Sequence, residues 1–156
     1  MNKLDMEIGD IIFVRGKSPV SFLVRLFDQG EFSHVALMIS NTHCIESQWN
    51  TRVRIVPMEF NDYEVVRIPL SDIRKDMIVR NAASLTGRWY DYRQIISYLI
   101  QRPWNAPNAY ICSEIITTLL FDKDMVLKPN ELYRYIIENE LNVKQTVDLC
   151  KTIELQ

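Results

Sequence analysis

The chain has 156 residues, of which 47% are hydrophobic and 24% charged, values typical of one globular domain with a substantial core. Its formal net charge of −2 gives no overall positive field, which argues against a nucleic-acid-binding protein. No run approaches the roughly 18 consecutive apolar residues of a membrane span, and residues 1–7 lack the apolar core of a secretory signal.

Three cysteines occur in unrelated contexts, at Cys44, Cys112 and Cys150. An odd number without a common spacing argues against a disulfide framework and fits a reducing compartment. We therefore expect a cytoplasmic protein, or one delivered in a virion or to a host without a signal peptide.

Apolar runs of strand length occur five times in the first half of the chain. They predict strands over 11–14, 35–39, 44–47, 53–56 and 64–70. In the last run, Val66, Ile68 and Leu70 alternate with polar residues such as Arg67. This alternation predicts that one face of the strand is buried and the other exposed.

Two helices are predicted from capping residues and apolar stripes. Ser18 before Pro19 predicts an N-cap, and Gly30 is expected to end the first helix. Its predicted apolar face consists of Val20, Leu23, Val24 and Phe27. Ser71 caps a second predicted helix, which ends at Gly87. The predicted buried stripe of the second helix consists of Ile73, Met77, Ala82 and Leu85.

Helical patterns continue through the second half of the chain. Asp91 is expected to cap a third helix, Pro103 and Pro107 bracket a loop, a fourth helix covers 112–121, and Pro129 starts a last amphipathic segment. Because strands cluster in the first half and helices in the second, the predicted class is α+β.

Cys112 is the most informative residue, because it stands where an apolar helix is predicted to begin. A thiol at a helix N-terminus faces the positive end of the helix dipole, which favours the thiolate that attacks carbonyl carbon. His34 heads a predicted strand, and Glu46 lies on the next one. An imidazole is suited to accept a thiol proton, and a carboxylate can fix its ring and tautomer. The three residues predict a cysteine hydrolase with Cys112 as nucleophile, His34 as base and Glu46 as orienting group.

Other polar and aromatic residues have simpler interpretations. His43 and Cys44 stand close to His34 in sequence, but their spacing fits none of the common zinc signatures, so we expect no metal and no cofactor. Arg52 and Arg54 are interpreted as a solvated strand face. An aromatic cluster precedes the nucleophile and either packs in the core or lines an apolar groove; it consists of Trp89, Tyr90, Tyr92, Trp104 and Tyr110.

Several short motifs follow one another in an order that resembles a known family. They are Gly9-Asp10-Ile11-Ile12, Phe32-Ser33-His34-Val35, Ile45-Glu46-Ser47, Gly87-Arg88-Trp89-Tyr90-Asp91, Cys112-Ser113-Glu114 and Lys128-Pro129-Asn130-Glu131-Leu132. Their order resembles that of the circularly permuted NlpC/P60 superfamily of papain-like cysteine hydrolases, specifically its YiiX/YebB-like branch. In the usual papain-like order the cysteine helix precedes the histidine strand, whereas here it follows.

The resemblance implies a permuted papain-like fold, with an antiparallel sheet or partial barrel packed against helices. It implies a single domain over residues 1–156, with a core over about 7–136 and a C-terminal extension over about 137–156.

For the site, the resemblance implies the same roles for Cys112, His34 and Glu46, and an oxyanion hole that uses the Cys112 backbone N–H. Tyr110, two residues before the nucleophile, is expected to line the pocket. Ser33 and Ser113, the sequence neighbours of the base and the nucleophile, are placed in the same substrate-binding or oxyanion neighbourhood.

The first functional expectation is hydrolysis of an amide, in a peptide or isopeptide-like bond, through a thioester. One alternative is a lipid esterase or acyltransferase of the same fold, similar to lecithin retinol acyltransferase, although that branch uses a second histidine where this chain has Glu46. Another alternative is a catalytically silent binding or host-interaction module. The expected partner is a peptide, amide or lipid acyl substrate, and the sequence leaves the acyl donor and the oligomeric state open.

Overall fold

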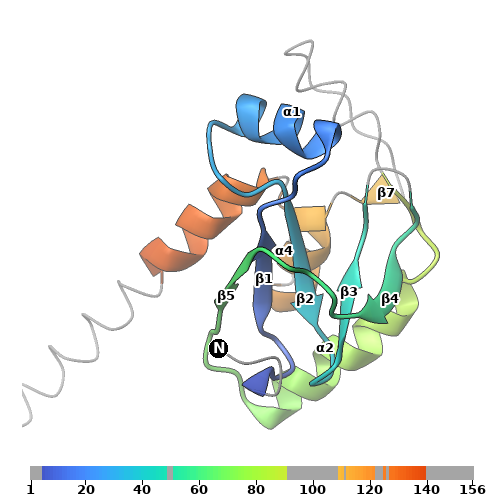
Figure 1. The fold of residues 1–156 in the computed structure, drawn as a ribbon. Helices are drawn as coiled ribbons and strands as arrows, with labels where there is room; N and C mark the ends of the chain where they lie inside the picture. Colours follow the sequence, from blue (N-terminus) through green and yellow to red (C-terminus); the bar gives the residue numbers. More distant parts are fainter. Residues whose placement is uncertain are drawn as a thin grey trace, which may run out of the picture.

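The computed structural model describes residues 5–48, 51–90, 109–110, 112–121, 125 and 127–139. Its elements follow in the order β1 (Ile11–Val14), α1 (Pro19–Asp28), β2 (His34–Met38), β3 (His43–Glu46), β4 (Arg54–Pro57), β5 (Tyr63–Val66), α2 (Asp72–Leu85), β6 (Trp89–Tyr90), β7 (Ala109–Tyr110) and α4 (Cys112–Phe121). A further helix covers 129–139. The fold is α+β, as the sequence predicts (Figure 1).

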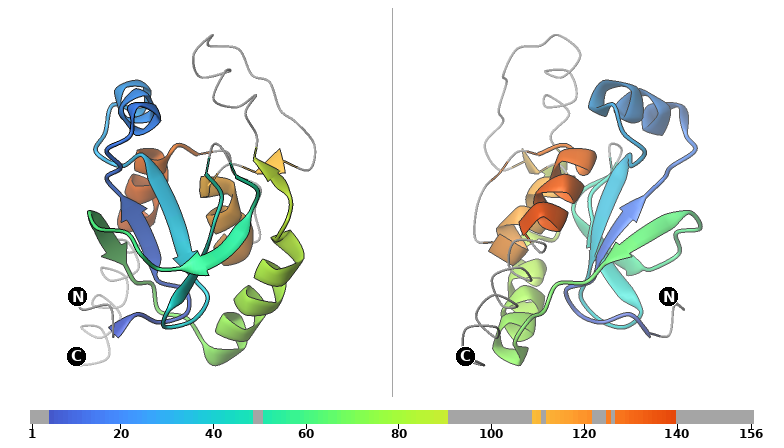
Figure 2. Two further views of the ribbon diagram at one scale, coloured as in Figure 1. Left: turned by 45° about the vertical axis from the view of Figure 1, so that its right-hand side comes forward. Right: turned by 90° about the vertical axis from the view of Figure 1, so that its left-hand side faces the viewer.

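Five strands form one open antiparallel sheet in the order β4-β3-β2-β1-β5. Helices α2 and α4 and the helix over 129–139 cover one face of this sheet, whereas α1 stands apart at one end (Figure 2). The two-residue strands β6 and β7 pair in parallel outside the main sheet. No helix in the described part of the chain is both long enough and apolar enough to cross a membrane.

The alternation of side chains along β1 divides the core in two. Ile11 and Phe13 belong to the main core with the helices, whereas Ile12 and Val14 belong to a smaller cluster on the opposite face. All four residues are buried, which explains why this strand is a continuous apolar run. The smaller cluster also contains Cys44.

The strand and cap predictions are confirmed with small shifts in bounds. Ser18 caps α1, where its hydroxyl accepts from the Ser21 N–H at 3.1 Å, and Ser71 caps α2. The predicted strand over 64–70 is too long, because β5 ends at Val66. Val66 pairs with Ile11, the first residue of β1, so β5 has no further ladder to follow beyond that point.

The predicted end of the first helix is wrong by one residue. Gln29, not Gly30, adopts the left-handed conformation, with φ 51°. Gly30 serves another purpose: a Cβ there would lie 2.2 Å from a side-chain atom of Asn130. Glycine therefore permits close packing at this position. Of the predicted apolar face, only Val24 has a described side chain, and it is partly buried.

The predicted buried stripe of α2 is also wrong in its first turn. Ile73 is 76% exposed and Met77 42% exposed, whereas the buried residues are Ile78, Ala82 and Leu85. The inward position one turn before Ile78 belongs to Arg74. Its guanidinium donates to the Leu119 and Leu120 carbonyls at the end of α4; the two residues share the last turn of that helix. The guanidinium hydrogen-bonds to carbonyls that have no partner within their own helix. The inward position in the first turn of α2 is therefore occupied by a charged side chain and not by an apolar one.

The helix predicted after Asp91 and the loop between Pro103 and Pro107 lie outside the described residues, as do Tyr92, Trp104 and Cys150. The helix predicted over 112–121 matches α4, and the amphipathic segment predicted from Pro129 matches the helix over 129–139.

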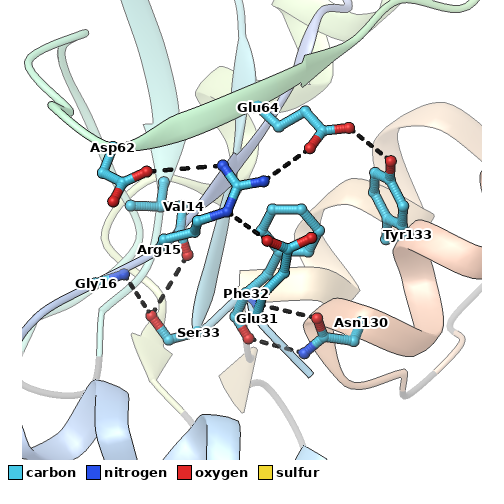
Figure 3. Close-up of polar contacts among 10 residues, drawn as sticks. All are labelled: Val14, Arg15, Gly16, Glu31, Phe32, Ser33, Asp62, Glu64, Asn130 and Tyr133. Carbon is cyan, nitrogen blue, oxygen red and sulfur yellow. Dashed lines mark hydrogen bonds and ion pairs between the residues drawn. The ribbon is translucent and has the colours of Figure 1, made fainter. Parts of the chain in front are cut away.

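The segment that leads into β2 is tied down by Asn130 (Figure 3). The Asn130 side chain accepts from the Phe32 N–H at 2.9 Å and donates to the Phe32 carbonyl at 2.8 Å. The same amide also donates to the carboxylate of Asp28, which receives the Asn130 backbone N–H at 2.8 Å. These bonds, made by a residue about 100 positions away in sequence, fix the chain just before His34.

Replacing Asn130 with alanine is expected to lower the free energy of unfolding by about 2–4 kcal/mol, because buried partners would lose their hydrogen bonds. Urea denaturation measures this change. Asn139→Ala is the matched control: that side chain is exposed and donates only within its own helix, to Tyr135. A loss equal to that of the control would contradict the structural role of Asn130.

Candidate active site

The ends of three elements bring the predicted site residues into one region. His34 is the first residue of β2, Glu46 the last residue of β3, and Cys112 the first residue of α4. Because β2 and β3 are antiparallel neighbours, the start of one lies beside the end of the other. Helix α4 packs against β2 and turns its N-terminus towards the same end of the sheet (Figure 1).

His34 and Glu46 form a direct pair. In the sheet register Leu37 faces Ile45, so Glu46 is the diagonal neighbour of His34 on the same face. Nε2 of His34 lies 2.8 Å from Oε2 of Glu46, whose side chain is only 1% exposed. The edge of the imidazole also meets the ring of Phe60, with centroids 5.7 Å apart.

Two further side chains hold Glu46, and sequence reasoning did not assign either to the site. Arg54 donates to Oε1 from Nε at 3.0 Å and from Nη2 at 2.7 Å. Gln48 donates from Nε2 to both carboxylate oxygens, at 3.2 and 3.0 Å. With the pair to His34, these contacts use the roughly four lone-pair positions of a carboxylate.

The interpretation of Arg54 as part of a solvated strand face is therefore incomplete. Its side chain is 44% exposed, but the guanidinium binds the buried Glu46, its register partner on β4. The predicted strands over 44–47 and 53–56 could have indicated this ion pair, because a hairpin of these two strands places Glu46 opposite Arg54. Arg52 lies elsewhere, with its guanidinium 3.7 Å from the centre of the Trp89 ring.

Glu46 is ionised throughout the neutral range. Burial by itself raises the pKa of this carboxyl, but the hydrogen bond and charge of His34, with the donors of Gln48 and Arg54, lower it to about 2. An ionised carboxylate only accepts hydrogen bonds. It follows that Nε2 of His34 carries a proton and donates to Glu46, which leaves Nδ1 as the ring nitrogen available to another partner.

The pKa of His34 is also affected by Cys112. Burial by itself lowers the pKa of His34, but side-chain hydrogen bonding to Cys112 and to Glu46, together with their negative charge, raises it to about 9. An imidazole with this pKa is protonated at neutral pH, so its positive charge lies beside the sulfur.

Cys112 occupies the position at which a helix offers free N–H groups. It is the first residue of α4, so its backbone N–H has no intrahelical acceptor, and the positive end of the helix dipole faces its sulfur. Cys44 provides a contrast, because burial and the charge of Glu46 raise the pKa of that thiol to about 12. Of the cysteines that the structure describes, Cys44 and Cys112 therefore have very different surroundings.

The other predicted pocket residues have mixed placements. The Ser33 hydroxyl accepts from the Gly16 N–H at 3.0 Å and donates to the Val14 carbonyl at 3.4 Å (Figure 3). The Ser113 hydroxyl donates to the carbonyl of Leu127. Both hydroxyl hydrogens are thus used within the fold, so neither serine has a hydroxyl hydrogen left for a substrate. The side chain of Tyr110 lies outside what the structure describes.

A metal site requires several donor side chains that lie close together. Within the described ranges, no three His, Cys, Asp or Glu side chains are grouped so that they could hold a metal ion. The lone pairs of Glu46 are taken by His34, Gln48 and Arg54.

No protein-family model matches the chain, and no curated protein matches it by sequence. Among solved structures, the chain is similar to the crystal structure of the metalloprotein yiiX from Escherichia coli O157:H7 (DUF1105). The TM-score is 0.54 and the identity 18%, over 76% of this chain and 68% of that chain. This likeness shows the fold, which is YiiX-like, as the resemblance of the motifs implied.

Proposed function

We propose that this chain is a cysteine hydrolase of the circularly permuted NlpC/P60 type, in which Cys112 is the nucleophile. The observation that supports the proposal is the imidazole of His34, which pairs with the buried carboxylate of Glu46 and interacts with the thiol of Cys112 at a helix N-terminus. A nucleophile, a base and a group that orients the base are the parts that nucleophilic catalysis requires.

In this proposal the proton of Cys112 rests on His34 before substrate arrives. The thiolate attacks the carbonyl carbon of an amide, a C–S bond forms, and the carbonyl oxygen becomes an oxyanion near the Cys112 backbone N–H. As the C–N bond breaks, Nδ1 of His34 gives its proton to the leaving amine. Water then attacks the thioester and loses a proton to His34, and the carboxylic acid leaves as the thiolate is restored.

Glu46 acts only as an acceptor in this cycle. All of its lone-pair positions are engaged by His34, Gln48 and Arg54, so it has no free position from which to take a proton. Its contribution is to hold the ring with Nδ1 towards the sulfur and to stabilise the imidazolium.

An amide is the preferred substrate class because an amine leaves only when its nitrogen is protonated. A histidine whose pKa is raised to about 9 holds a proton for that purpose at neutral pH. Fluorogenic peptide and isopeptide amides should therefore be cleaved by the wild-type protein and not by Cys112→Ala. Cleavage of lipid esters alone would assign the protein to the esterase alternative.

Alkylation with iodoacetamide tests the activated thiol without knowledge of the substrate. At pH 6, Cys112 is expected to react on the order of 100-fold faster than Cys44, whose pKa is raised to about 12. Mass spectrometry of proteolytic peptides gives both rates in one sample. Slow labelling of both thiols at the same rate would count against a catalytic Cys112.

A further inference from the structure

We propose that Arg54 is a positioning residue of this site: it acts through Glu46 to keep His34 charged and aimed at Cys112. This inference rests on the proposed function, because it assigns a role within the same reaction. Arg54 does not contact the thiol in the described structure; it contacts the carboxylate that orients the imidazole.

The division of the carboxylate between its partners is the first argument. Arg54 binds Oε1 with both Nε and Nη2, whereas His34 binds Oε2. Fixing one oxygen from β4 sets the rotation of the carboxylate, and so directs the other oxygen at Nε2 of the imidazole. Gln48 bridges both oxygens and supports the same orientation.

The permanent charge of Arg54 is the second argument. The Glu46 side chain is buried, and an ionised carboxylate out of water requires a compensating cation. His34 cannot supply that charge throughout a turnover, because it becomes neutral each time it gives its proton to a leaving group. Arginine stays protonated at any working pH, so Arg54 keeps Glu46 ionised while His34 is neutral.

The partial exposure of Arg54 makes the test practical. About half of its side chain faces solvent on β4 at the edge of the sheet, so its replacement removes few core contacts. Arg52, two residues earlier, is the matched control: it bonds to the Gly87 carbonyl and covers the Trp89 ring, away from Glu46.

The experiment measures the rate of Cys112 alkylation by iodoacetamide from pH 5 to pH 10. In Arg54→Ala the rate at pH 6 is expected to fall roughly tenfold. Without the arginine charge, the neutral form of the Cys112–His34 pair is favoured over the thiolate–imidazolium form, so less thiolate is present. A tenfold fall is equivalent to a change of about one pKa unit. At pH 10 all variants should converge, since every thiol with solvent access is then ionised. Arg54→Lys should recover part of the loss, because it keeps the charge but not the two-point hold on Oε1, and Arg52→Ala should match the wild type.

An unchanged pH profile in Arg54→Ala, beside a wild type that labels quickly at pH 6, would overturn the role of Arg54 alone. A wild type without selective labelling would instead overturn the proposed function. If Arg54→Ala unfolds, faster labelling of Cys44 will reveal it. In that case Arg54→Lys and Arg54→Gln are compared instead. Equal rates of Cys112 alkylation at pH 6 in these two variants would overturn a role for the charge of Arg54.

Discussion

His34→Ala is expected to slow the alkylation of Cys112 at pH 6 by about twentyfold and to leave the rate at pH 10 nearly unchanged. A thiol of ordinary pKa is only about 0.3% ionised at pH 6. Thiolates of lower pKa are weaker nucleophiles, which offsets part of the difference in thiolate fraction. The remaining effect is the contribution of the imidazolium that lies beside the sulfur.

The control for this variant is His43→Ala. His43 is exposed, and its Nδ1 meets the Thr42 hydroxyl at 2.9 Å, so it shares the residue type of His34 but not its surroundings. Rates are measured by mass spectrometry on the Cys112 peptide, with Cys44 as an internal standard for unfolding. A His34→Ala protein that still labels rapidly at pH 6 would remove His34 from the mechanism.

The largest loss of stability is expected from Phe32→Ala, at about 3–5 kcal/mol. The Phe32 ring is almost fully buried against two other rings, with centroid distances of 5.3 Å to Phe13 and 4.9 Å to Tyr133. This aromatic cluster joins β1, which contains Phe13, the segment before β2, and the helix over 129–139, which contains Tyr133. Its truncation would leave a cavity where these three segments meet.

Urea denaturation of Phe32→Ala measures this loss, and Phe22→Ala is the matched control. The Phe22 side chain on α1 is 59% exposed, so its removal should change the free energy of unfolding by less than about 0.5 kcal/mol. A loss below about 1 kcal/mol for Phe32→Ala would show that the aromatic cluster is not a main part of the core.

The parts of the fold that depend on local signals were predictable from the sequence. Ser18 and Ser71 cap the helices that follow them, and the apolar run over 11–14 is the buried strand β1. The buried face of α2 was not predictable from the sequence, because Arg74 binds carbonyls of a helix that comes much later in the chain. Nothing near Arg74 in sequence indicates that distant helix end.

Part of the candidate site was predictable for a similar reason. The order of strands suggested that His34 and Glu46 lie side by side, and the register of β2 and β3 confirms that they are diagonal neighbours. Arg54 was missed because its charge suggested solvent, although its cross-strand partner was a residue already chosen for the site. Gln48 follows β3 in a turn, where no periodic pattern indicates the direction of a side chain.

The separate packing of the two buried cysteines bears on how the protein would respond to oxidants. Cys112 belongs to the main core with the helices, whereas Cys44 belongs to the smaller cluster and pairs with Met38, four residues or about 13 Å along β2 from His34. A disulfide requires Cα atoms within roughly 7 Å, so Cys44 cannot resolve a sulfenic acid formed on Cys112. Among the cysteines that the structure describes, none can therefore reduce that sulfenic acid, and sustained exposure to peroxide without a second thiol would lead to the irreversible sulfinic acid.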